Sequence, residues 1–235
     1  NSLSMVFELV KLLGVNNTEE DITGEETLKA LIKIKKSMQR INDIHPSSLG
    51  LHPAVYIYSR SGNFRVSCFH ATIVFIEELS NNKKLNVFTQ HRAEFENIII
   101  SSDVLIQQIV RKARQANKAV APLVKFFHAI LDNLSNATES DEVLIMLSKS
   151  SDFSYLNLDD LHQEETASTS FSKSTKSAAY ISEAIKTSPK CKICGGILHQ
   201  KSISIDHKIR KEDGGTGLLS NAQLSHPYCN TTYKN

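Results

Sequence analysis

The chain has 235 residues, of which 40% are hydrophobic and 22% are charged, proportions that are typical of a soluble globular protein with one large domain or two small ones. No segment contains the roughly 20 consecutive apolar residues of a membrane helix, and the first residues lack the basic and apolar regions of a secretory signal. The formal net charge is only +2, so the distribution of charge along the chain is more informative than its total. Because the chain begins with Asn1 and not with methionine, we expect a natural N-terminus and a further domain upstream.

Residues 1–149 have the apolar periodicity of a helical domain. The first predicted helix covers Ser2–Leu13 and ends at Gly14. The second begins near Thr23, which has Glu26 three residues later in the pattern of a capping box, and it continues to about Ile44. The apolar residues of this helix that we expect to face inward are Leu28, Leu31, Ile32, Ile34, Met38 and Ile41.

Residues 46–63 have the composition of a loop, in which Val55–Tyr58 form either a short strand or a buried helical turn. Further helices are predicted near residues 66–80, 84–100, 102–116 and 118–134, followed by a shorter piece at 142–147. The stretch 119–134 is apolar around much of its circumference, which predicts a central helix.

Residues 150–177 differ in composition, since eight of the twelve residues Thr166–Ser177 are Ser or Thr. We predict a linker there and a C-terminal domain over residues 178–235, with a short helix near 176–186 leading into it. Residues 190–235 carry seven Lys or Arg and three acids, a net charge of +4, whereas the rest of the chain carries 20 and 22, a net charge of −2. A basic module of this kind suits contact with a phosphate backbone.

Three of the four cysteines lie in this C-terminal module. Cys191-x-x-Cys194 and His226-x-x-Cys229 are two ligand pairs whose thiolates and imidazole can complete a tetrahedron around Zn²⁺. A lone C-x-x-C pair would also suit redox chemistry, and the second pair is what favours zinc. Because all four ligands come from the protein, the zinc is expected to be structural, and the thiols indicate a reducing cytoplasm. The remaining Cys68 is predicted to be a buried thiol.

A strand-like run over residues 202–205 leads to Asp206 and His207, between the two ligand pairs. A carboxylate there can hold a hard cation such as Mg²⁺, and a neutral imidazole can deprotonate water. Phosphodiester hydrolysis uses both functions. An isolated Asp-His dipeptide is more often an ordinary surface feature. The position of this dipeptide between the two ligand pairs is what favours a catalytic role.

Two asparagines accompany the second ligand pair. Asn221 lies just before it, and Asn230 follows Cys229 directly, in a short helix predicted over about His226–Tyr233 that would point the Asn230 amide toward the dyad. An amide oxygen is a suitable ligand for a hard metal ion. The alternative is that either asparagine is an ordinary turn or cap residue.

Together these residues resemble the HNH endonucleases, which are ββα-metal nucleases, with an added zinc-ribbon clasp. The resemblance covers Cys191–Asn230 and rests on the two ligand pairs, Asp206-His207, Gly214-Gly215, Asn221, Gln223, Leu224 and Asn230. It implies that His207 is the general base and that Asp206 and Asn230 hold one catalytic Mg²⁺ or Mn²⁺. It also implies that Asn221 constrains the loop that orients His207. The implied reaction is hydrolysis of DNA, with RNA not excluded, to a 5′-phosphate and a 3′-hydroxyl.

Two positions depart from the family pattern. The third zinc ligand, usually a cysteine, is His226 here. A lysine that usually follows the asparagine by three residues comes one place later, at Lys234, where we expect a phosphate contact at most. The cations Lys208, Arg210 and Lys211 are either further backbone contacts or parts of a solvated loop.

The helical part carries no catalytic motif. Its loop Ser47–Tyr56, followed by Ser59–Gly62, resembles the helical region of bacterial proteins that place a ParB-like, sulfiredoxin-like domain ahead of an HNH nuclease. This resemblance implies an upstream domain, a bacterial cytoplasmic setting and a role in anti-phage restriction.

The sequence therefore predicts a mainly α protein with a helical domain at 1–149, a linker at 150–177 and an HNH domain with a structural zinc at 178–235. We predict a metal-dependent endonuclease, for which a homodimer is one way to cut both DNA strands. The alternative is a zinc-ribbon module that binds nucleic acid without cutting it, joined to a helical domain that binds a protein partner.

Overall fold

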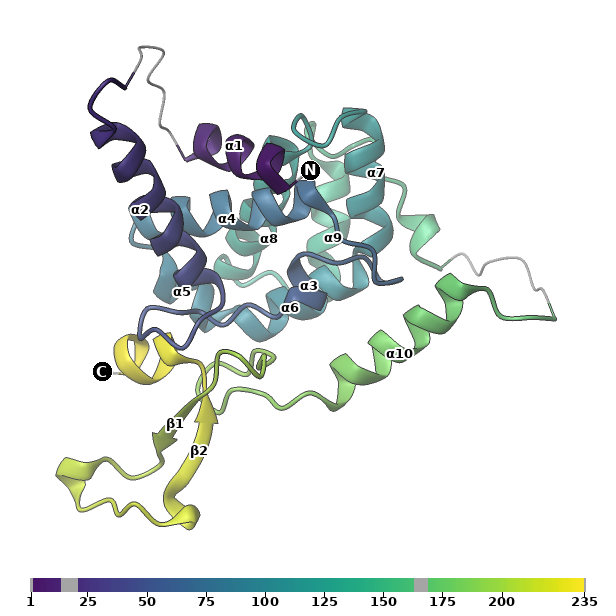
Figure 1. Cartoon of the computed structure of the whole chain (residues 1–235). Helices are drawn as coiled ribbons and strands as arrows, with labels where there is room; N and C mark the ends of the chain where they lie inside the picture. Colours follow the sequence, from purple (N-terminus) through teal and green to yellow (C-terminus); the bar gives the residue numbers. More distant parts are fainter. Residues whose placement is uncertain (1, 14–20, 163–168, 235) are drawn as a thin grey trace.

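A computed structural model describes residues 2–13, 21–162 and 169–234 of the protein (Figure 1). Gly14, residues 163–168 of the predicted linker and Asn1 lie outside these residues. The helices of the described residues are α1 (Ser2–Leu12), α2 (Glu25–Ile41), α3 (Pro53–Tyr56), α4 (Val66–Asn81), α5 (Leu85–Gln90), α6 (Arg92–Ser101), α7 (Asp103–Ala113), α8 (Val120–Ser135), α9 (Ser140–Lys149) and α10 (Lys173–Thr187). The strands are β1 (Ser204–His207) and β2 (Ala222–Ser225), and the short helical turns are η1 (Leu158–His162), η2 (Lys211–Asp213), η3 (Leu219–Asn221) and the π-helical turn η4 (Cys229–Tyr233). The prediction of a mainly α chain that ends in a small ββα unit is confirmed.

Helices α4 and α8 lie at the centre of the helical body, packed along each other. Phe75 of α4 contacts the rings of Phe88 and Phe127 at centroid distances of 5.9 and 5.6 Å. Each fully buried phenylalanine contributes on the order of 1.5–3 kcal/mol relative to an exposed one. The predicted central helix is confirmed, with α4 as its partner. The predicted burial of Cys68 on α4 is also confirmed, and this burial raises the pKa of its thiol.

The predicted orientation of α2 is wrong for most of its apolar residues. Leu28, Leu31, Ile32 and Met38 are exposed, whereas Ile41 is buried. The apolar stripe exists, but α2 lies at the edge of the body and turns a narrower face, which includes Ala30 and Ser37, toward its neighbours α1 and α4. Amphipathic spacing predicts the helix, and its contacts with other helices decide which face is covered.

The predicted capping box at the start of α2 is also wrong. Gly24 is the N-cap, with φ of 73°, and the Glu26 carboxylate binds Lys29. The backbone N–H of Thr27 in the first turn has no partner within the helix and donates to the Asp21 carboxylate at 2.7 Å. This hydrogen bond lowers the pKa of Asp21. A carboxylate at this end also suits the helix dipole.

Two further elements differ in detail from the expectation. The predicted helix over 84–100 is divided at His91 into α5 and α6, because His91 leaves helical geometry with φ of −99° and ψ of 14°. Val55 and Tyr56 belong to the helical turn α3 and are buried, which decides between the two alternatives for Val55–Tyr58.

The structure has no helix among the described residues that is long and apolar enough to cross a membrane.

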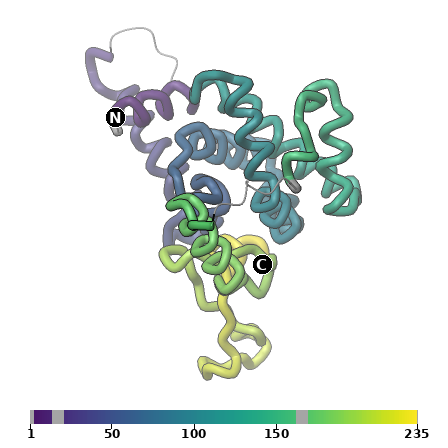
Figure 2. Tube along the Cα trace, turned by 90° about the vertical axis from the view of Figure 1, so that its right-hand side faces the viewer, coloured from purple at the N-terminus to yellow at the C-terminus, as the bar shows by residue number. Residues whose placement is uncertain are grey.

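The C-terminal module has a small core of its own and is attached to the helical body. Figures 1 and 2 show the β1–β2 hairpin projecting away from the body, with the short C-terminal helix between the two. The loop over residues 42–51 forms much of this junction: Ser48 binds Ser202 through their hydroxyls at 3.0 Å, and the Tyr228 N–H donates to the carbonyl of Ser48 at 2.9 Å. Gly50 has a φ of 59°, and a Cβ there would meet Ser202 and His226 at 2.8 and 2.9 Å. Only glycine allows this close approach.

Candidate active site and zinc centre

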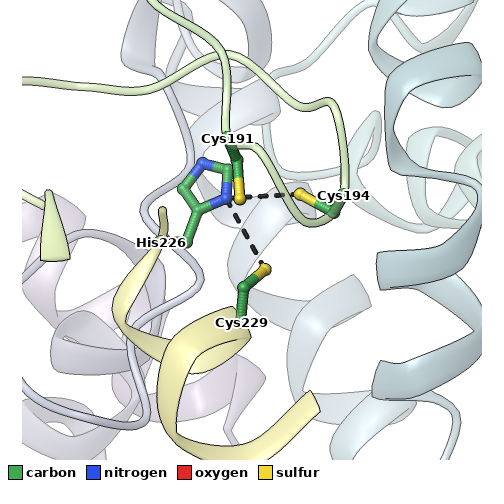
Figure 3. Close-up of side chains that lie close together, drawn as sticks. All are labelled: Cys191, Cys194, His226 and Cys229. Atoms are coloured by element: carbon green, nitrogen blue, oxygen red, sulfur yellow. Dashed lines mark hydrogen bonds between the residues drawn. The ribbon is translucent and has the colours of Figure 1, made fainter. Parts of the chain in front are cut away.

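The side chains of Cys191, Cys194, His226 and Cys229 converge in the interior of the C-terminal module, as predicted (Figure 3). The first pair lies in a tight turn in which the Cys191 N–H donates to the carbonyl of Gly196 and the Gly195 N–H donates to the carbonyl of Cys191. His226 follows β2, and Cys229 begins η4. The turn, the strand end and the final helical turn therefore deliver one ligand set from three elements.

The geometry and chemistry of this cluster fit a zinc ion. The four ligand atoms lie within 4.8 Å of one another, and all four residues are buried. Zinc bonds of about 2.3 Å to sulfur and about 2.0–2.1 Å to nitrogen can reach a common point in such a cluster. Hydrogen bonds from Cys194 and Cys229 lower the pKa of the Cys191 thiol. The pKa of Cys194 is raised to about 11, and the largest cause is the hydrogen bond that Cys194 makes with Cys191. Three adjacent thiols cannot all ionise without a cation between them. A zinc ion would supply this positive charge and stabilise the three thiolates.

The ring of His226 is oriented for metal binding through one nitrogen. Its Nδ1 lies 3.4 Å from Sγ of Cys194 and 3.8 Å from Sγ of Cys229, and its Nε2 lies 3.2 Å from the carbonyl oxygen of Ile197. Burial and then the positive charge of Arg92 lower the pKa of His226, so the ring is neutral. A proton on Nε2, donated to Ile197, leaves Nδ1 as the ligand, which is the usual way that an outer contact fixes the tautomer of a metal-binding histidine.

A buried ion pair joins this cluster to the helical body. Arg92 and Glu96, one turn apart on α6, are 0% and 1% exposed in their side chains, and Nε of Arg92 lies 2.7 Å from Glu96. The guanidinium also donates to the carbonyls of Leu49 and Gly50, and its Nη1 lies 3.2 Å from Nδ1 of His226. Burial by itself would lower the pKa of Arg92, but the Glu96 carboxylate, together with Tyr56 and the thiols of Cys194 and Cys229, outweighs burial and raises the pKa.

Glu96 completes the junction from its other side. One carboxylate oxygen accepts the N–H of Ile197 at 2.6 Å, and the other accepts the Tyr56 hydroxyl at 3.0 Å. Sequence reasoning missed Arg92 and Glu96. Their four-residue spacing suggests an ordinary helical ion pair. Only the burial of both charges and the contact of Glu96 with Ile197 reveal that the pair supports the turn that carries Cys191 and Cys194.

Asp206 and His207 lie within β1, which pairs antiparallel with β2 so that Asp206 is opposite Gln223 and His207 is opposite Ala222. Neighbouring residues on a strand point to opposite faces, so the two side chains diverge. Asp206 is buried and His207 is half-buried. No residue that the structure describes hydrogen-bonds the His207 imidazole.

The Asp206 carboxylate is held by two side chains. Nε2 of Gln223 donates to Oδ2 at 2.6 Å, and Nζ of Lys234 donates to Oδ1 at 3.0 Å and to Oδ2 at 2.7 Å. Nζ of Lys234 also donates to the carbonyl of His207 at 2.7 Å. Lys234 therefore does more than the phosphate contact expected of it, because its ammonium binds the proposed metal ligand.

Asn221 fixes the loop between the strands. Its Oδ1 accepts the N–H of Ile209 at 2.8 Å, and its Nδ2 donates to the carbonyls of Ile209 and Thr216 at 3.1 and 2.8 Å. The backbone at Gly215 passes so close to Ile209 that a Cβ there would lie 1.9 Å from the Ile209 carbonyl oxygen. The asparagine and the glycine together set the path of the chain immediately after His207.

Asn230 belongs to η4 and lies against β1. Its Nδ2 donates to the hydroxyl of Ser204 at 2.7 Å and to the carbonyl of Ile205 at 3.4 Å. The cations Lys208, Arg210 and Lys211 are exposed on the projecting loop. Arg210 is paired with Glu212 at 3.1 Å, and its other nitrogen donates to the carbonyl of Lys234.

Comparison with known proteins adds one family. The family model described as HNH endonuclease matches residues 191–235, the segment that contains both ligand pairs, the dyad and the two asparagines. No curated protein and no solved structure matches the chain. The match, the gathered ligands and the ββα arrangement agree, so the chain carries a domain over residues 191–235 that is similar to the HNH endonucleases.

Proposed function

We propose that this protein is a metal-dependent HNH endonuclease that hydrolyses phosphodiester bonds in DNA. The observation that carries the proposal is the hairpin itself. It combines a buried carboxylate at Asp206 with an imidazole at His207 that has no hydrogen-bond partner among the described residues, inside the segment that matches the family. A structural zinc at the base of the hairpin keeps this arrangement attached to the helical body.

His207 is the general base in this proposal. A half-buried imidazole without a hydrogen-bond partner among the described residues can take a proton from a water molecule that attacks phosphorus. Asn221 supports this role through its three hydrogen bonds to the loop after His207, since a base has to be held at a defined position relative to the phosphate.

Asp206 and Asn230 would hold the catalytic Mg²⁺ or Mn²⁺. Such an ion, when bound, stabilises the negative charge that develops at the phosphate and the leaving oxygen. Lys234 has to give up its contacts with both oxygens of Asp206 for a cation to bind there. We propose that the released ammonium then contacts substrate phosphate, as the resemblance implied.

The substrate surface is the projecting hairpin and its loop. Lys208, Arg210 and Lys211 lie on this loop, away from the helical body, where they can contact a nucleic-acid backbone. DNA is the proposed substrate and RNA the alternative. Such an enzyme cuts one strand per active site, so cleavage of both strands requires a homodimer or two events.

The biological setting rests on the resemblance of the loop over 47–62 alone. We propose a bacterial cytoplasmic enzyme of anti-phage restriction, with an upstream ParB-like domain that controls the nuclease. The domain limits 1–149, 150–177 and 178–235 remain part of this proposal.

Cleavage of supercoiled plasmid in the presence of Mg²⁺ or Mn²⁺ tests the activity. The protein should nick the plasmid, and His207→Ala should abolish nicking while zinc content and thermal unfolding stay unchanged. His45→Ala, at an exposed histidine of the loop over residues 42–51, is the matched control and should cut normally. Equal cutting by His207→Ala and the parent would refute the assignment of the base.

The alternative is a zinc module that binds nucleic acid without cutting it, with the helical body as a protein-binding scaffold. One observation favours it: Lys234 and Gln223 together engage the Asp206 carboxylate, as in a purely structural ion pair. The two functions differ in metal binding. Quenching of intrinsic fluorescence by Mn²⁺ that disappears in Asp206→Asn favours the nuclease, and no Mn²⁺ binding to either protein favours the alternative.

A further inference from the structure

A cavity of about 540 Å³ lies between the helical body and α10, away from the hairpin. Its walls come from α3, α6 and α7 on one side and from α10 on the other, and Figure 1 shows α10 lying beside the lower face of the body. Cavities of this volume are typical of sites for small molecules. The proposed nuclease chemistry uses none of its residues.

The cavity is strongly basic. Arg60, Arg65, Lys186 and Lys190 line it, and Asp103 is the one acid among its lining residues, which gives four positive charges against one negative charge, a net +3. Asp103 is already engaged by the Arg65 guanidinium. Among the described residues, none forms a salt bridge with the other three cations. A concave site with three uncompensated cations attracts an anion.

Arg65 supplies a second, independent observation. Its Nε and Nη1 are buried and have no hydrogen-bond partner among the described residues, while its Nη2 binds Asp103 and the carbonyl of Tyr58. Buried donors without an acceptor are rare because their desolvation is not compensated. A guanidinium with two unsatisfied donors at the wall of a basic cavity suits a phosphate, which offers several acceptor oxygens.

The uncharged lining residues are mostly apolar, with Asn97, Ser101 and Ser182 as the polar ones, and they include one aromatic ring. Ile100 of α6, Ile181 and Ile185 of α10, and Tyr58 line the cavity. None of the residues of α10 is buried, so this helix covers the cavity without filling it. An occupant that matches both halves has an anionic head and an apolar or aromatic body.

We propose that this cavity binds a small phosphate ester of mononucleotide size. The phosphate accepts hydrogen bonds from the Arg65 guanidinium, and Arg60, Lys186 and Lys190 add positive charge around it. The base or another planar group lies between Tyr58 and the isoleucines. The binding site is independent of the proposed nuclease activity, but it is connected to the HNH domain. Ile197 lines the cavity, and its backbone also binds Glu96 and His226 at the zinc centre.

Calorimetric titration of the zinc-loaded chain with ATP, without added Mg²⁺, tests the proposal and does not depend on cleavage. One ATP should bind per chain, adenosine should bind much more weakly, and Lys186→Glu should reduce the affinity for ATP roughly tenfold or more. Lys176→Glu is the matched control, since it makes the same charge change on an exposed residue of the same helix outside the cavity. It should bind ATP as the parent does.

A second variant blocks the cavity without changing charge. Ile181→Trp places a large ring inside from a helix that has no buried residue, so the helical body should keep its thermal stability while ATP binding is lost. No ATP binding by the parent, or equal weakening by Lys186→Glu and Lys176→Glu, overturns the proposal. It is also overturned if Ile181→Trp binds ATP normally, or if Lys186→Glu impairs the binding of short duplex DNA and not of ATP, which would make the cavity part of a DNA surface.

Discussion

Replacement of Arg92 by leucine tests whether the buried ion pair supports both the fold and the zinc centre. The substitution removes the partner of Glu96, the donors to the carbonyls of Leu49 and Gly50, and the positive charge beside His226. Leucine keeps most of the apolar volume, so the main change is in charge and hydrogen bonding.

Two magnitudes follow from these contacts. Removal of one partner of a fully buried ion pair costs about 3–5 kcal/mol, because the remaining charge is left without compensation. A zinc ion with three thiolates and one neutral imidazole carries a net charge of −1, which Arg92 offsets at close range. Arg92 also holds Glu96, which binds the backbone of Ile197, the outer partner of His226. Loss of an outer contact typically weakens metal binding about 10–100-fold.

Urea denaturation and zinc competition with a chromophoric chelator measure the two effects separately. Arg40→Leu is the matched control on the same helical body, since Arg40 pairs with Glu77 at 3.5 Å but is 27% exposed. That pair should contribute less than about 1 kcal/mol and should not affect zinc. If Arg92→Leu is no less stable than Arg40→Leu and retains zinc equally well, the reasoning about the junction is refuted.

Three other predictions concern the metal sites and pH. Cys229→Ser should release zinc and unfold the C-terminal module, as measured by atomic absorption and hydrogen exchange; a folded, zinc-loaded variant would disprove the ligand assignment. Asp206→Asn should abolish Mg²⁺-dependent nicking with zinc content unchanged, and loss of zinc would mean that the two metal sites are confused. Burial, with His199 close by, lowers the pKa of His52 from 6.5 to about 4, so the folded state keeps this ring neutral while the unfolded chain takes up a proton below pH 6.5. The stability that His52 contributes is therefore complete above pH 6.5 and is lost as the pH falls toward 4. In thermal denaturation at pH 7.5 and 5, His52→Gln should lose less stability than the parent, and an equal loss would contradict the assignment.

The sequence by itself determined the local chemistry of this protein. The spacing of Cys191, Cys194, His226 and Cys229 predicted the ligand cluster because a tight turn and one helical turn bring such pairs together from short distances along the chain. Apolar periodicity predicted the helices for the same reason, since each is defined by residues three and four positions apart. Even here a residue such as His91 could end a helix without a visible signal.

The tertiary structure alone decided how these parts meet. The contacts of Glu96 with Ile197, of Ser48 with Ser202 and of Arg92 with His226 join residues separated by 101, 154 and 134 positions. No local pattern encodes such pairs, because each depends on how two finished elements pack. The same reason explains the exposed apolar face of α2 and the ion pair between Lys234 and Asp206. Residue types and spacing along the chain thus predicted the Cys/His cluster that could hold zinc, and packing determined the buried charges that surround it.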